Sequence, residues 1–209
     1  MAWVNYIREK VAGEFFIRYP ILCFLITFWA LQQEGKKILY SLWKEKKKIF
    51  WQAIKLLFFF ALLHFALKLV LGWVAPSSWS SIKSEKITAQ INLITSSKNN
   101  WWYLTQIIFG ICVLAPIVEE CIFRYFVFKI FGKKNPLSYL VSFFTFIWVH
   151  YHRGENIPLL FFQYSVATSG FIYIYKKSGW KLLSPILLHS LVNLLFIIMV
   201  LISPTFSLI

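Results

Sequence analysis

Long apolar stretches alternate with short basic segments along the chain. Apolar residues dominate six ranges: 15–32, 50–74, 102–131, 136–151, 158–175 and 180–203. About 20 apolar residues are needed for a helix to cross a hydrocarbon core of about 30 Å. The pattern therefore predicts an all-α fold, a polytopic transmembrane helical bundle, in which the range 136–151 is a short span.

The polar segment 75–100 is predicted to be the largest loop between these spans. Aromatic residues flank it on both sides, as expected where helices meet the water boundary: Trp73, Trp79, Trp101, Trp102 and Tyr103.

Basic residues are distributed unevenly between the predicted connections. The connections 33–49, 132–135 and 176–181 hold eleven lysines, whereas the N-terminal segment and the other connections hold six basic residues. Basic residues are retained on the cytoplasmic side, so the count favours both termini outside.

The composition supports an integral membrane protein. The chain of 209 residues is 59% hydrophobic and only 14% charged, whereas a soluble domain is about 45–50% apolar and 25% charged. Topology accounts for the net charge of +14, so the partner expected is the lipid bilayer and no nucleic acid. No linker or repeat divides the chain, and residues 1–209 are predicted to form one domain.

Two adjacent carboxylates, Glu119 and Glu120, lie inside the apolar stretch 107–131, and Arg124 follows. Ionisable residues are costly within a membrane and usually mark a working site. Residues four apart share a helix face, so Glu120 is expected to pair with Arg124. Glu119 projects about a quarter turn away, and it is the predicted reactive carboxylate.

Pro116 lies three residues before Glu119. Its ring denies a hydrogen bond to the carbonyl of Cys112, so a kink is expected beside the carboxylates. An irregular helix is a way to form a polar pocket at membrane depth.

Two further pairs with helical spacing follow the carboxylates. Phe146 precedes His150 by four residues, and His189 precedes Asn193 by four. A carboxylate and an imidazole are common general bases, so Glu119 and His150 could hold and deprotonate a water. His189 and Asn193 could then donate hydrogen bonds to the oxyanion that forms on a peptide carbonyl.

The ordered motifs EECIFR, FIWVH and HSLVN resemble the family of CAAX prenyl endopeptidases and bacteriocin-processing proteins, with its signature EExxxR, FxxxH and HxxxN/B. The resemblance covers roughly residues 100–200, which makes 100–203 the expected catalytic core. The family is known for glutamate-dependent intramembrane proteolysis and commonly has about eight helices. The expected bundle therefore has about six to eight.

The resemblance implies a glutamate-dependent membrane endopeptidase, in a prokaryotic cytoplasmic membrane, acting on a membrane-associated protein or peptide, prenylated or leader-bearing. Glu119 would activate water with help from His150, while His189 and Asn193 would form the oxyanion hole. Supporting residues would be Glu120, Arg124 and Phe146, with Phe146 packed under the site. No spacing forms a two-histidine metal pair such as HExxH, so neither a metal nor another cofactor is expected.

Alternatives remain at several positions. Glu120 and Arg124 could be only an internal ion pair, and Asn193 only a helix-to-helix hydrogen-bonding residue. His152 competes with His150, although the motif spacing selects His150. The whole protein could instead be a non-catalytic membrane binding protein that confers bacteriocin immunity, or a proton-coupled carrier that uses Glu119 as a relay.

The depths of the predicted spans do not agree. Glu119 and His189 fall in the inner half of the membrane, while His150 falls near the outer end of a short span, a mismatch of about 10 Å at 1.5 Å per residue. Either the helix 136–151 begins deeper than assumed, or the topology differs by one crossing.

Overall fold

The computed structural model describes residues 20–44, 47–48, 50–55, 57–59, 85–151 and 157–202, together with the single positions 62, 66 and 69. Every regular element within these ranges is helical, so the prediction of an all-α fold is confirmed. Parts of the predicted spans 15–32 and 50–74, and the alternative histidine His152, lie outside the described residues.

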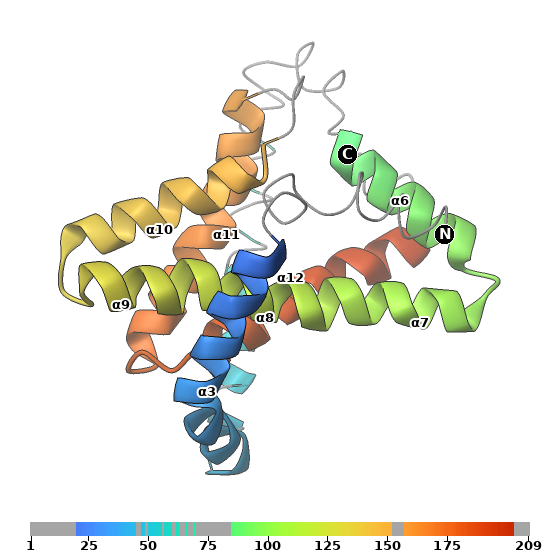
Figure 1. Cartoon of the computed structure of the whole chain (residues 1–209). Coiled ribbons are helices and arrows are strands. Elements are labelled where there is room, and N and C mark those ends of the chain that lie inside the picture. The colour runs from blue at the N-terminus through green and yellow to red at the C-terminus, as the bar shows by residue number, and fades with distance from the viewer. Residues whose placement is uncertain are drawn as a thin grey trace.

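One long helix, Trp101–Phe131, runs through the middle of the fold (Figure 1). It consists of α7 (Trp101–Phe109), α8 (Ala115–Glu120) and α9 (Val127–Phe131), joined by the π-helical turns η2 (Gly110–Leu114) and η3 (Cys121–Phe126). Its 31 residues span about 46 Å at 1.5 Å per residue. We refer to it as the central helix.

The irregularity predicted at Pro116 takes the form of a π-helical turn. The backbone N–H of Ala115 donates to the carbonyl of Gly110, five residues earlier, just before the proline. A second turn of this kind follows the carboxylates, where the N–H of Val127 reaches the carbonyl of Ile122. The helix thus continues past Pro116, with widened turns on both sides of Glu119 and Glu120.

Among the helices whose bounds the structure describes, five others surround the central helix. They are α3 (Pro20–Lys44), α6 (Glu85–Ser97), α10 (Pro136–Val149), α11 (Ile157–Lys177) and α12 (Leu183–Ile202). α3 contacts α8 and η3, α10 contacts η3 and α9, and α12 contacts η2 and α8. α11 packs against α10 and α12 and is linked to η3 by the hydrogen bond between Arg124 and Thr168. The arrangement of the helices is seen in Figure 1.

Two predicted boundaries are wrong. α3 continues to Lys44, past the predicted end at 32, because residues 33–44 are rich in the helix-forming residues Gln, Leu and Lys. The predicted loop 75–100 contains α6, whose residues Ile91 and Ile94 lie on one helix face. That face packs against Leu104 and Ile197, which explains why the segment folds.

The central helix and α12 are each long and apolar enough to cross a membrane. α10, with 14 residues, is apolar but spans only about 21 Å. A helix of this length is too short to cross a hydrocarbon core of about 30 Å.

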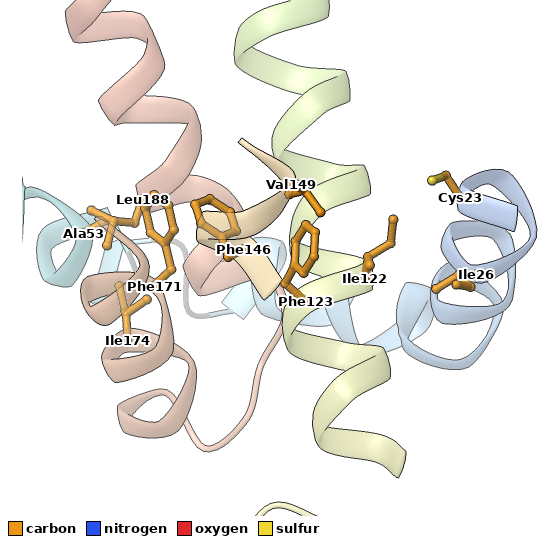
Figure 2. Packing of buried hydrophobic residues seen from close by; sticks show 10 residues of the cluster. All are labelled: Cys23, Ile26, Ala53, Ile122, Phe123, Phe146, Val149, Phe171, Ile174 and Leu188. Carbon is orange, nitrogen blue, oxygen red and sulfur yellow. The ribbon is translucent and has the colours of Figure 1, made fainter. Parts of the chain in front are cut away.

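The largest apolar core lies where α10, α11 and α12 meet η3 (Figure 2). Phe146 and Phe123 make an edge-to-face contact with ring centroids 5.4 Å apart, and Phe171 and Leu188 lie on the other side of Phe146. The polar residues described below pack against these apolar side chains.

A second aromatic cluster joins the ends of three helices. Phe128 of α9 is 1% exposed and contacts Tyr139, Tyr175 and Trp180, with ring centroids 5.1 to 5.7 Å apart. Trp180 has φ of 65°, an unusual backbone conformation for a non-glycine residue. Its aromatic contacts offset that strain and hold the turn between α11 and α12.

Replacing Phe128 with alanine is expected to lower the free energy of unfolding by about 3–5 kcal/mol, because it leaves a cavity among three aromatic rings. The measurement is thermal or denaturant unfolding of the purified protein in detergent. Phe109→Ala is the matched control, since Phe109 is 51% exposed and its loss opens no cavity. Equal losses for the two variants would show that the cluster is not a stabilising core.

Candidate active site

Four helical segments bring the sequence-predicted polar residues together. α8 supplies Glu119 and Glu120, η3 supplies Arg124, and α12 supplies His189. His150 is the residue that ends α10. All five side chains are at most 11% exposed, so the polar cluster is enclosed by the apolar core.

Glu119 faces two imidazole rings. Its Oε2 lies 3.6 Å from Nε2 of His150 and 3.8 Å from Nε2 of His189. Both distances exceed the usual range of a direct hydrogen bond, about 2.7–3.2 Å. The three groups therefore converge on one point from three different elements.

This convergence removes the mismatch in depth that the predicted spans gave. α10 ends at His150, and the 3.6 Å contact places that end at the level of Glu119. α10 is also too short to cross a hydrocarbon core of about 30 Å. Both explanations offered by the sequence, a displaced 136–151 helix and a topology that differs by one crossing, stay predictions.

Glu120 takes part in a buried ion pair, as its spacing predicts. Its Oε2 lies 3.1 Å from Nε of Arg124, and both side chains are fully buried. Its other oxygen, Oε1, lies 3.0 Å from Nδ1 of His189. Arg124 also donates a hydrogen bond of 2.9 Å to Oγ1 of Thr168 in α11. The pair therefore connects the central helix to both α11 and α12.

Each histidine is oriented through its Nδ1. That of His150 lies 2.7 Å from the carbonyl of Phe146, and a carbonyl only accepts, so this nitrogen carries the proton. In the neutral ring Nε2 is then an acceptor directed at Glu119. His189 likewise donates Nδ1–H to the carboxylate of Glu120, and its Nε2 also faces Glu119.

Phe146 lies beneath these polar groups. The Arg124 guanidinium is 4.4 Å from the centre of its ring, and the His150 ring is 4.6 Å from it. A cation over an aromatic face is stabilised by the ring quadrupole. Phe146 thus supports both the ion pair and one imidazole.

Three residues of α11 complete the site, and the sequence reasoning missed them. Tyr164 lies 4.4 Å from the His150 ring, and Phe171 stacks on His189 at 4.5 Å. Thr168 accepts from Arg124. The spacing i, i+4, i+7 puts all three on one helix face, which is the signal that could have identified them.

Asn193 is placed differently from the other motif residues. It lies one turn after His189 on α12, and its Nδ2 donates a hydrogen bond of 2.8 Å to the carbonyl of Ile111 in η2. The amide thus binds the backbone of the central helix eight residues before Glu119.

A structural metal site needs three or four donor side chains that converge on one point. Within the part of the chain that the structure describes, no group of three or more His, Cys, Asp or Glu side chains has the geometry to hold one. The cysteines Cys23, Cys112 and Cys121 are buried and unpaired with one another.

Residues 100–195 match the family model described as type II CAAX prenyl endopeptidase Rce1-like. This part of the chain belongs to that family. The matched CAAX endopeptidase region includes the carboxylates, both histidines, Asn193 and the α11 face. Comparisons with curated proteins and with solved structures gave no match. The match supports a CAAX-type membrane protease in general terms.

Arg124→Met is expected to lower the free energy of unfolding by about 3–5 kcal/mol, because it leaves the buried Glu120 carboxylate without its cationic partner. Unfolding of the purified protein in detergent measures the change. Glu120→Gln combined with Arg124→Met removes both charges, and this double variant is expected to be more stable than Arg124→Met alone. A double variant as unstable as the single one would contradict an ion pair as the source of the loss.

Proposed function

We propose that this protein is an intramembrane endopeptidase that hydrolyses a peptide bond in a membrane-associated protein or peptide through water activated by Glu119. The observation that carries the proposal is the convergence of Glu119 Oε2 with Nε2 of His150 and Nε2 of His189 inside an apolar core. The family match supports proteolysis in general. The geometry supports Glu119, His150 and His189 as the catalytic residues.

In the first step, Glu119 and His150 hold the attacking water. Both present acceptor atoms, so the water can donate one O–H to the carboxylate and the other to Nε2 of His150. As the water oxygen attacks the peptide carbonyl carbon, its proton passes to Glu119. The carbonyl π bond opens and gives a tetrahedral oxyanion.

His189 stabilises that oxyanion. Donation from Nε2 requires a doubly protonated ring, since Nδ1–H is already directed at Glu120. The charges allow this form: two carboxylates, one guanidinium and one imidazolium sum to zero. The oxyanion then re-forms the C=O bond as the C–N bond breaks, and Glu119 returns its proton to the leaving nitrogen. The products are a carboxylic acid and an amine, and the acid then passes its proton to the amine. The sequence prediction that Asn193 is a second oxyanion donor stays a prediction.

Adjacent Glu120 is proposed as a supporting residue and not as a base. Its two oxygens are engaged with Arg124 and His189. A carboxylate whose two oxygens are both engaged by neighbouring side chains is poorly placed to bind the attacking water. Phe146, Tyr164 and Phe171 hold the two imidazole rings at their working orientation.

The substrate class follows from the surroundings of the site. The enclosing surface is rich in apolar side chains exposed at the outside, such as Phe109, Trp148 and Ile202, which suit contact with lipid. We propose a multi-pass protein of a prokaryotic cytoplasmic membrane, with substrates whose cleavage site is held at the bilayer by a prenyl group, a leader or a transmembrane tail.

Glu119→Gln is expected to abolish cleavage, with a loss of at least 10²–10⁴-fold for removal of a general base. The measurement compares protein and peptide termini in membranes of the native host that carry wild type or the variant at matched levels. Glu34→Gln is the matched control, because Glu34 lies in α3 and pairs with Lys37 at 2.8 Å, outside the site.

Termini found with wild type and Glu34→Gln but absent with Glu119→Gln would support the proposal and reveal the bond. Termini unchanged by Glu119→Gln would overturn it and favour a non-catalytic role such as bacteriocin immunity.

Cleavage by the purified protein is expected to be unchanged by EDTA or 1,10-phenanthroline, because Glu119 and the two imidazoles are assigned to water and the oxyanion. The assay uses a peptide that spans the cleavage site identified in the host. Loss of cleavage with chelator, restored by added Zn²⁺, would contradict a metal-independent mechanism.

A further inference from the structure

The carbonyl of Ile111 has lost both of its ordinary partners. In an α-helix it would accept from the N–H of Ala115, four residues later, but that N–H is bound to Gly110. In a π-helical turn it would accept from residue 116, but Pro116 has no N–H. The Ile111 carbonyl therefore receives no hydrogen bond from the backbone of residue 115 or of residue 116.

Asn193 fills this position from another helix. Its Nδ2–H donates to the Ile111 carbonyl at 2.8 Å across 82 residues of sequence. In an apolar surrounding a carbonyl without a partner is costly, so the side-chain amide replaces a backbone hydrogen bond that Pro116 removed.

The turn held in this way sets the direction of Glu119. A π-helical turn accommodates one extra residue, which rotates everything after it by about 100° relative to a regular α-helix. η2 ends at Leu114, so the rotation applies to α8 and to both of its carboxylates. Loss of the turn would redirect Glu119 away from the two imidazoles.

α12 thus contacts the central helix at two levels. Asn193 binds Ile111 ahead of Pro116, and His189, one turn earlier on α12, binds Glu120 after it. The first contact lies within the irregular turn η2 and the second lies beyond Pro116, and together they fix the geometry of the turn and its distance from the site.

We propose that Asn193 is a positioning residue: its amide caps the carbonyl left by Pro116 and thereby locks the turn that directs Glu119 at His150 and His189. The effect on catalysis rests on the function proposed above. The hydrogen bond from Asn193 to the Ile111 carbonyl does not depend on that function.

The test is a double-mutant cycle on the full-length purified protein in detergent, with thermal unfolding as the first readout. Asn193→Leu removes the donor while keeping the branching of the side chain, and is expected to lower Tm by about 3–8 °C. In a Pro116→Ala background the new N–H can serve Ile111, so Asn193→Leu is expected to cost less than half as much. An equal loss in both backgrounds, or no loss at all, would overturn the cap.

Asn92→Leu provides the matched control. Asn92 is exposed on α6, and the same substitution there is expected to give a Tm change that is independent of Pro116→Ala. Dependence on Pro116 at both sites would show a general effect of the proline and overturn a specific link to Asn193.

Cleavage kinetics supply the second readout, on the peptide identified with wild type. We expect Asn193→Leu to lower kcat by about 10²-fold at unchanged KM, since a displaced base affects the reaction and not substrate binding. An unchanged kcat in the folded protein would indicate a purely structural residue. A lower kcat without Tm coupling to Pro116 would indicate an oxyanion donor. Either result would overturn the positioning role, and the Tm coupling stays interpretable if the proposed function itself fails.

Discussion

The buried carboxylate of Glu120 is the interaction on which the site depends. A carboxylate in an apolar core is tolerated only when its charge and its hydrogen-bonding oxygens are matched by partners. Glu120 meets this need with Arg124 one turn later and with His189 on α12, and Arg124 continues the connection to Thr168 on α11. The central helix, α11 and α12 are therefore fixed relative to one another by interactions that all begin at the Glu120 carboxylate. This arrangement carries Glu119, the next residue in the chain, to its place between two imidazoles.

Adjacency along the helix separates the two carboxylates by function. Successive residues differ by about 100° around the helix axis, so Glu119 and Glu120 meet different neighbours although their backbones are contiguous. Glu120 faces the Arg124 guanidinium and the Nδ1–H of His189, and these contacts suit a stabilising ion pair. Glu119 faces the Nε2 atoms of His150 and His189, an arrangement that suits the proposed proton transfer. His189 touches both carboxylates and makes their positions interdependent. π-helical turns lie on both sides of the two carboxylates, and they let the helix continue past Pro116 while Glu119 and Glu120 keep these directions around its axis.

Much of this arrangement was predictable because helical spacing is local. The Glu120 and Arg124 pair, the irregularity at Pro116 and the all-α fold follow from residues within one or two turns. The meeting of Glu119 with His150 was not, since assigning full spans placed His150 at the wrong depth. α6 was missed because its apolar face is narrow and its flanks are polar. Tyr164, Thr168 and Phe171 were missed because aromatic residues make up 20% of the chain, so their shared helix face is only a weak signal until its partners are known.

The most direct test of this account is the cleavage rate per folded molecule, measured side by side for purified Glu119→Gln and Glu120→Gln with the unfolding temperature of each sample. The account predicts that Glu119→Gln unfolds at nearly the wild-type temperature and does not cleave, whereas Glu120→Gln is clearly destabilised and its folded fraction retains measurable cleavage. Cleavage at the wild-type rate by folded Glu119→Gln, or loss of cleavage confined to Glu120→Gln, would contradict the assignment of the two carboxylates.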